Sequence, residues 1–132
     1  MHGLSSFEYT VVRVVPRVDR EEFVNAGVVL FCLDQRFLAA RVRVDQARLI
    51  ALCPSANLDL IRTHLDAFPS ICDGTAMGPI ALLPQRDRFK WLAAPRSTVV
   101  QVSPVHSGLC SSPQERLYEL FKRLVLVEPE QC

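Results

Sequence analysis

Two long apolar runs near the start of the chain constrain the fold more than any other feature. FEYTVVRVV (7–15) and FVNAGVVLFCL (23–33) are rich in β-branched and aromatic residues, and they place apolar side chains at consecutive positions. Successive side chains of a strand point to opposite faces of the sheet, so both runs need apolar neighbours on both faces. They are therefore predicted to be the central strands of a sheet. Pro16 ends the first run, and the charged connector RVDREE leads to the second.

Two further strands are expected. From Phe37 to Val44, apolar residues alternate with Arg41 and Arg43, which predicts a strand with one wet face, nearer a sheet edge. The short turn Asp34-Gln35-Arg36 makes this strand the antiparallel partner of the run before it. Ser97 to Ser103 is predicted to be the fourth strand.

Helical signals fill the middle of the chain. Asp45 is placed to cap a short helix that runs to Leu52. Ser55 or Asn57 then opens a second helix, which Pro69 and Asp73-Gly74 are expected to break. Apolar residues recur along one face of this helix at helical spacing, at positions 58, 61, 65 and 68. The stretch 74–84 (GTAMGPIALLP) is interpreted as a packed loop.

The last helix carries the strongest local signal. Ser112 is the expected N-cap, Pro113 occupies the first helical position, and Glu115 completes a capping box. Glu119 is expected to pair with Lys122 or Arg123. The predicted buried stripe consists of Leu117, Leu120, Phe121, Leu124 and Val125. Taken together, the elements predict an α+β fold, a mainly antiparallel sheet of about four strands with helices packed on one face.

The length of 132 residues predicts a single domain, 1–132, with its core at about 7–126. Hydrophobic content of 49% and a net charge of +1 argue against a disordered chain and against one that coats nucleic acid by bulk charge. No apolar run approaches the ~18 residues of a membrane span, and no export signal is visible, so a cytoplasmic location without a membrane partner is expected. The five cysteines (32, 53, 72, 110 and 132) lack a CxxC pair and are interpreted as reduced thiols; no metal site and no cofactor are expected.

Positive charge is concentrated between Arg86 and Gly108 (RDRFKWLAAPRSTVVQVSPVHSG), which holds four cationic side chains, one acid and the only tryptophan. Guanidinium groups and hydroxyls suit a phosphate or carboxylate, and an aromatic ring beside cations offers a stacking surface. The alternative is a core tryptophan with arginines on a solvated rim. The candidate binding residues here are Arg88, Lys90, Trp91, Arg96, Ser97 and Thr98.

Three candidates lie outside this cluster. His106, in a predicted loop beside two serines, has the chemistry of a general base or a phosphate ligand, or is merely exposed. Asn25 interrupts an apolar strand beside Gly27, which indicates a bulge or a close backbone approach. Glu22 and Asn25 are hypothesised to hold Arg88 or Arg96 and so to build one face from distant segments; the alternative is that both are satisfied locally.

No phosphate loop, dinucleotide fingerprint, zinc-protease helix or nucleophile elbow occurs in the sequence. Two functions from different classes remain. The first is a binding or accessory module for an anionic partner, namely a phosphate group, a nucleic-acid backbone or another protein. The second is a small hydrolase or nuclease that uses His106 with Arg88 and Arg96 on a phosphodiester. Few acids lie near the basic residues, which favours binding. A third option is a subunit that docks through its apolar 74–84 loop.

Three segments in this order resemble a bacterial family of unknown function, number 3037: FEYTVVRVVPRVDREEFVNAGVVLF, RFKWLAAPRSTVVQVSPVHSG and SSPQERLYELFKRLV. The resemblance extends from about Phe7 to about Val125. It implies a small, single-domain cytoplasmic protein without an established activity, and a HipA-like kinase-fold protein as a partner. It assigns no site residues.

Overall fold

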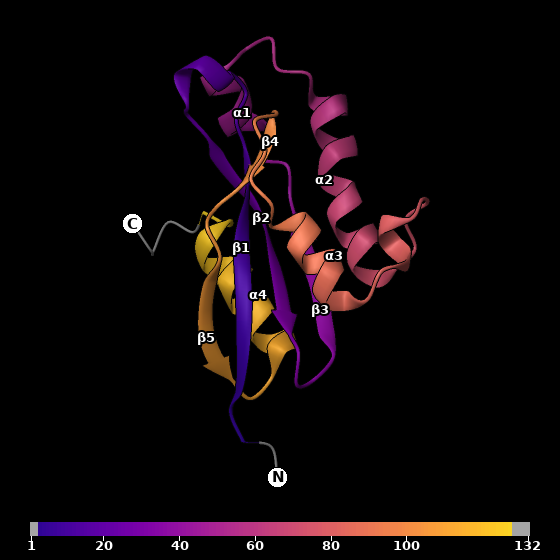
Figure 1. Cartoon of the computed structure of the whole chain (residues 1–132). Coiled ribbons are helices and arrows are strands. Elements are labelled where there is room, and N and C mark those ends of the chain that lie inside the picture. Colours follow the sequence, from indigo (N-terminus) through magenta and orange to yellow (C-terminus); the bar gives the residue numbers. More distant parts are fainter. Residues whose placement is uncertain (1–2, 128–132) are drawn as a thin grey trace.

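The computed structural model describes residues 3–127 and has a five-stranded antiparallel sheet with four α-helices and two 3-10 turns (Figure 1). This is the predicted α+β class. The elements in chain order are β1 (Ser5–Val14), η1 (Val18–Arg20), β2 (Val24–Cys32), β3 (Phe37–Val42), α1 (Gln46–Leu52), α2 (Leu58–Asp73), η2 (Ile80–Leu82), α3 (Gln85–Leu92), β4 (Val100–Val102), β5 (His106–Cys110) and α4 (Pro113–Leu124).

The sheet has the order β3-β2-β1-β4, and β5 pairs with β1 as well. The first half of β1 pairs with β5 and its second half with β4, so the two short strands share one edge of β1. The predictions of central β1 and β2 and an outer β3 are confirmed. The predicted loop around His106 is wrong, because this residue begins β5 opposite Tyr9.

The polar interruption in β2 is a β-bulge. The register of β1 against β2 shifts between Val12, opposite Gly27, and Arg13, opposite Asn25, so Ala26 is the extra residue. A Cβ at Gly27 would lie 2.7 Å from the Arg41 carbonyl oxygen of β3, which no larger residue tolerates. Both readings of this interruption, bulge and close approach, are confirmed.

The helix starts follow the predicted caps. The Asp45 carboxylate accepts from the Arg48 amide at 3.1 Å, and the Asn57 side chain accepts from the Leu60 amide at 3.1 Å. The predicted break of α2 at Pro69 is wrong, whereas the predicted break at Asp73-Gly74 is confirmed. Proline removes one helical hydrogen bond, but Ile71 beyond it is buried in the core, and this packing stabilises the last turn. The helix ends at Gly74, which adopts φ +80°.

Helices cover both faces of the sheet, which differs from the expected packing on one face. One apolar cluster joins α1, α2 and α3 to one face, where Val29 and Phe31 point. The other cluster joins α4 to the opposite face, where Val28 and Leu30 point. The physical reason is present in the sequence, because strands that are apolar on both faces need cover on both (Figure 1).

The last helix packs as predicted. Ser112 Oγ accepts from the Glu115 amide at 3.3 Å, and Leu117, Leu120, Phe121 and Val125 are buried, while Leu124 is partly buried. The predicted pairing of Glu119 with Lys122 or Arg123 is wrong, because Glu119 pairs with Arg116 at 3.4 Å, one turn earlier.

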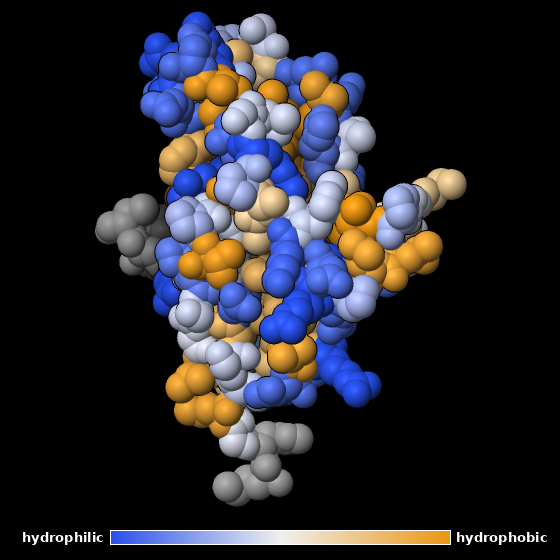
Figure 2. Space-filling view, in the orientation of Figure 1, coloured by the Kyte–Doolittle hydropathy of each residue, from blue (hydrophilic) through white to orange (hydrophobic). Residues whose placement is uncertain are grey.

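The segment between α2 and α3 is more exposed than a packed loop. Only Ala81 is buried within it, whereas Met77 is fully exposed and Leu82 is 84% exposed. Figure 2 shows apolar surface gathered over this part, on the right of the view. Within residues 3–127 no helix is both long and apolar enough to cross a membrane.

Candidate functional site

Arg88, a predicted binding residue, has a structural role in the fold. Its Nε donates to the Leu83 carbonyl at 2.8 Å, and its Nη1 donates to the carbonyls of Ile71 and Cys72 at 3.0 and 2.7 Å. The last carbonyls of a helix have no partner within the helix. Arg88 of α3 therefore caps the C-terminal end of α2 and ties the two helices together.

Arg96 lies in a different setting. Its guanidinium is centred 5.2 Å from the Trp91 ring and 5.5 Å from the Phe68 ring, and its one hydrogen bond within residues 3–127 is donated to the Trp91 carbonyl at 3.0 Å. Burial lowers the pKa of this guanidinium. No carboxylate of the described residues lies within ion-pairing distance of Arg96.

A groove of about 230 Å³ surrounds Arg96, and in the following it is called the Arg96 groove. It separates α2 from the chain that leads into β4. Trp91, 44% exposed, and Phe68 provide aromatic walls beside Arg96, while the Thr98 hydroxyl donates to the Val100 carbonyl at 2.8 Å. The residues lining it are His64, Ala67, Phe68, Ile71, Trp91, Leu92, Arg96, Thr98 and Val100.

The three consecutive candidates Arg96, Ser97 and Thr98 are divided between two sides of the chain. Arg96 and Thr98 face the groove, whereas Ser97 lines a separate hollow with Arg13 and Phe23. Arg13 stacks on the Phe23 ring at 4.3 Å. Alternation is the ordinary behaviour of an extended segment, so Ser97 does not reach the Arg96 groove.

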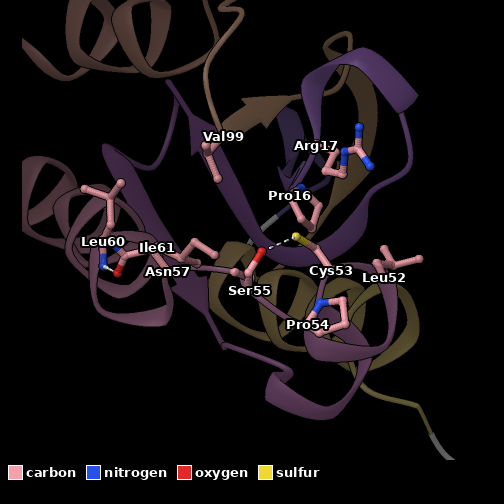
Figure 3. Close-up of a pocket in the computed structure, with 11 residues that line it drawn as sticks. Pro16, Arg17, Leu52, Cys53, Pro54, Ser55, Asn57, Leu60, Ile61 and Val99 are labelled. Carbon is pink, nitrogen blue, oxygen red and sulfur yellow. Dashed lines mark hydrogen bonds between the residues drawn. The ribbon is translucent and has the colours of Figure 1, made fainter.

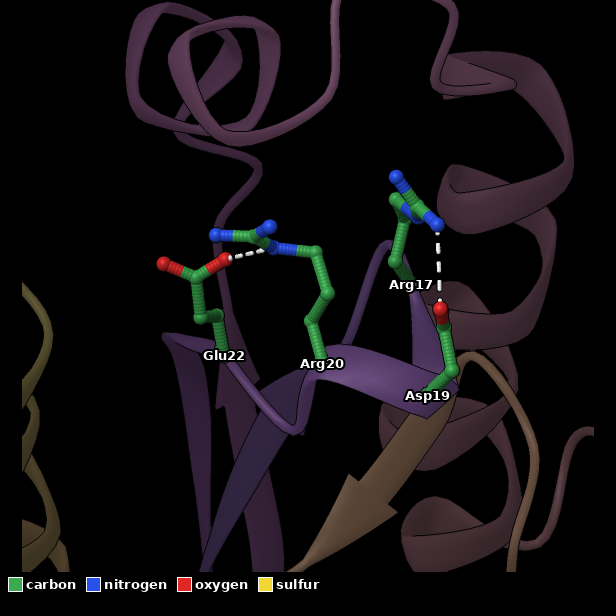
Figure 4. A network of polar contacts seen from close by, with 4 residues as sticks. All are labelled: Arg17, Asp19, Arg20 and Glu22. Carbon is green, nitrogen blue, oxygen red and sulfur yellow. Dashed lines mark hydrogen bonds and ion pairs between the residues drawn. The ribbon is translucent and has the colours of Figure 1, made fainter.

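Glu22 and Asn25 form hydrogen bonds with residues other than Arg88 and Arg96. Glu22 accepts from Arg20 Nε at 2.5 Å beside the neighbouring Arg17–Asp19 pair (Figure 4), and this bond lowers the pKa of Glu22. Asn25 Nδ2 donates to the Leu124 carbonyl at 3.0 Å and so anchors the end of α4 to the bulge. Neither residue bonds to Arg88 or Arg96, which was the hypothesised arrangement.

His106 and Lys90 lie elsewhere on the surface. The His106 ring packs on Tyr9 at 5.2 Å, and Tyr9 lies against the α4 cluster, on the face opposite the Arg96 groove. Lys90 is exposed on α3 and lines a hollow with Arg86 and Glu8. The structure thus brings together three of the nine sequence candidates, Trp91, Arg96 and Thr98.

A larger cavity of about 550 Å³ adjoins the Arg96 groove at the start of α2, and we call it the Cys53 cavity. The Cys53 thiol lies 3.6 Å from the Ser55 hydroxyl, and Asn57 caps the Leu60 amide nearby (Figure 3). Its lining residues are Pro16, Arg17, Leu52, Cys53, Pro54, Ser55, Ala56, Asn57, Leu60, Ile61 and Val99.

Sequence reasoning missed His64 and the Cys53 cavity. His64 is exposed, and it also lines the groove, one helical turn before Phe68. The spacing of His64, Ala67 and Ile71 along one flank of α2 is a signal for this. The Cys53 cavity had no such signal, because β1, α2 and the chain before β4 meet there only after folding.

The cysteines of the described residues, Cys32, Cys53, Cys72 and Cys110, are free, and Cys132 lies outside that part of the chain. Burial raises the pKa of the Cys72 thiol to about 12 and also raises that of Cys110. Between residues 3 and 127 no three His, Cys, Asp or Glu side chains are grouped so as to hold a metal ion.

The fold and the groove define a small α+β domain with a half-buried cation beside an aromatic wall. The chain belongs to the family described as Protein of unknown function (DUF3037), whose model matches residues 9–125. Comparisons with curated proteins and with solved structures gave no match.

Proposed function

We propose that this protein is a binding module that receives an anionic group of a partner in the Arg96 groove. The observation that carries the proposal is the unpaired guanidinium of Arg96, half-buried between Trp91 and Phe68. A cation removed from water without a counterion is costly. A ligand carboxylate or phosphate would supply the counterion and would use guanidinium donors that have no partner among residues 3–127.

The walls of the groove favour a protein as the partner. Apart from Arg96 and His64, the groove is lined by apolar side chains and one threonine. Binding to a nucleic-acid backbone depends on several cations that each neutralise a phosphate, and this groove offers one arginine. An acidic or phosphorylated side chain beside an apolar residue matches it better. A HipA-like kinase-fold protein is the first such partner to test.

The hydrolase alternative draws no support from the arrangement. It needs His106 beside Arg88 and Arg96. The His106 ring packs on Tyr9, Arg88 donates to main-chain carbonyls, and Arg96 stacks on Trp91 in the Arg96 groove. A general base must lie within hydrogen-bonding reach of the proton that it removes.

The test is a titration of the purified chain, followed by the fluorescence of Trp91 and by calorimetry, at low and high salt. The probes are inorganic phosphate, an oligothymidylate, and a HipA-like kinase-fold protein. Binding of the protein partner should weaken with salt. Arg96→Gln should lower the affinity at least tenfold, and Arg96→Lys should restore part of it, because lysine lacks the bidentate fork.

Lys90→Gln is the matched control. It removes the same charge from an exposed position of α3 outside the groove, so its affinity should stay within about twofold of the wild type. Equal binding by wild type and Arg96→Gln, with every probe, would overturn the proposal. Stronger binding of the oligothymidylate than of the protein would assign the groove to nucleic acid instead.

A further inference from the structure

The Arg96 groove and the Cys53 cavity follow one another along α2, and together they are called the seam. Leu60 lines the Cys53 cavity, and His64, one helical turn later on the same flank, lines the Arg96 groove. On the opposite wall, Val99 lines the first and its neighbour Thr98 lines the second. The two hollows are therefore adjacent along both walls.

The charged side chains that line the seam are basic. Its ionisable lining residues, other than the Cys53 thiol, are Arg17 at one end, His64 in the middle and Arg96 at the other end, and no Asp or Glu of residues 3–127 lines either hollow. Arg17 also pairs with Asp19 at 3.0 Å, but both side chains are more than half exposed. Exposed pairs of this kind are weak and leave Arg17 able to exchange partners.

The length of the seam sets the size of its occupant. Its α2 wall runs from Asn57 to Ile71, which is about 21 Å at the rise of an α-helix. About six residues of extended chain cover that distance.

We infer that the seam binds an extended, acidic segment of a partner protein, about six residues long, with an apolar side chain in the Cys53 cavity and a carboxylate on Arg96. This inference rests on the proposed function and names the class of its ligand. Charge complementarity identifies the occupant as acidic, and the apolar walls formed by Leu60, Ile61 and Val99 identify its anchor as aliphatic or aromatic.

The probe is a displayed library of random eight-residue peptides, selected on the purified full chain. The selected peptides should contain Asp or Glu together with large apolar residues. The best of them, made as a free peptide, is then titrated against three variants. Arg96→Gln should weaken its binding at least tenfold. Leu60→Glu, which adds a negative charge at a 44% exposed position of the Cys53 cavity, should weaken it to a similar degree.

Leu82→Glu is the matched control, because it makes the same change at an 84% exposed leucine outside the seam, and its binding should stay within twofold. Circular dichroism of each variant verifies that it is folded. Wild-type binding by Leu60→Glu together with loss in Arg96→Gln would overturn the extended seam and leave the proposed function standing. Wild-type binding by Arg96→Gln would overturn both. Selection of basic peptides, or of none, would overturn the inference of an acidic segment, and the titrations of phosphate and kinase-fold protein would then decide the proposed function alone.

Discussion

The two faces of the sheet are covered in different ways. On one face, α4 is a single helix with a defined cap, a buried stripe and an anchor from Asn25 to its last turn. On the other face, α1, α2 and α3 are separate pieces, and the seam opens where α2 meets the chain before β4. Three helices on one face meet at junctions, and the seam lies at one of these junctions. Both faces hold a buried apolar cluster, and the second face also holds the candidate site.

Two arginines make the same contrast within the second face. Arg88 donates to two carbonyls at the end of α2 and to the Leu83 carbonyl, so its guanidinium has a structural role. Arg96, eight positions later, donates one hydrogen bond, and its other guanidinium donors have no partner within residues 3–127. Residue type alone therefore does not separate a cation with a structural role from a candidate binding cation, whereas the number of donors already used does.

The largest effect should come from the α4 face. Leu120→Ala should lower the free energy of unfolding by about 2–5 kcal/mol, because it leaves a cavity under α4. Urea denaturation measures this, and anion affinity under folding conditions should be unchanged. Leu109→Ala, at a 57% exposed leucine of β5, is the control and should cost less than about 0.5 kcal/mol. A loss of anion affinity in Leu120→Ala would contradict the independence of the candidate site from the α4 face.

Arg88→Met should come next, at about 2 kcal/mol, because it removes the Arg88 donors to the Cys72 and Leu83 carbonyls and one of the two donors to the Ile71 carbonyl. Arg86→Met, at an exposed position of the same helix, should be nearly neutral. The measurement is again urea denaturation. If Arg88→Met were as stable as the wild type, Arg88 would have to be returned to the candidate binding residues.

Ser112→Ala should cost about 1 kcal/mol, the usual loss for an N-cap, because the Glu115 amide loses its acceptor. Ser107→Ala, at an exposed position of β5, is the control. Thermal and urea melts should rank Leu120→Ala above Ser112→Ala. The reverse order would contradict the buried stripe assigned to α4.

Arg96→Met should change the free energy of unfolding by about 0.5 kcal/mol or less, because stacking on Trp91 and Phe68 is lost while a desolvated charge is removed. The binding titrations measure the same variant, which should lose the ligand. The two variants should thus differ: Arg88→Met mainly lowers the free energy of unfolding, and Arg96→Met mainly lowers ligand affinity. A destabilisation of Arg96→Met equal to that of Arg88→Met would remove the contrast.

The last effect is absent at neutral pH and appears only at alkaline pH. Burial raises the pKa of Cys72 to about 12, so above about pH 9 the unfolded chain releases this proton while the folded chain keeps it. The free energy of unfolding should therefore fall as pH rises from 9 towards 12, and it should fall less steeply in Cys72→Ala. At pH 8, a thiol reagent should modify the partly exposed Cys53 faster than Cys72. Equal slopes would show that the Cys72 thiol ionises freely in the folded protein.

Local signals account for the parts of the fold that the sequence predicted. The caps at Asp45, Asn57 and Ser112, and the apolar character of both central strands, depend on residues close together in the chain. The overrun of α2 past Pro69 depends on long-range packing of Ile71, which outweighs the missing hydrogen bond. Strand alternation could have placed Ser97 apart from Arg96 and Thr98. Arg88 could not have been assigned, because its carbonyl partners lie sixteen and seventeen positions earlier.

The pairing of β1 with both β4 and β5 has a consequence for the order of folding during synthesis. Ser5 lies opposite Cys110, whereas β1, β2 and β3 form a meander that is complete at Val42. At 5–20 residues per second, roughly 3 to 14 seconds of translation separate the meander from its last strand. During that interval one edge of β1 is unpaired and an apolar face of the sheet is uncovered, because the residues that cover them have not yet been synthesised. The nascent protein is therefore most open to mispairing before its C-terminal third emerges.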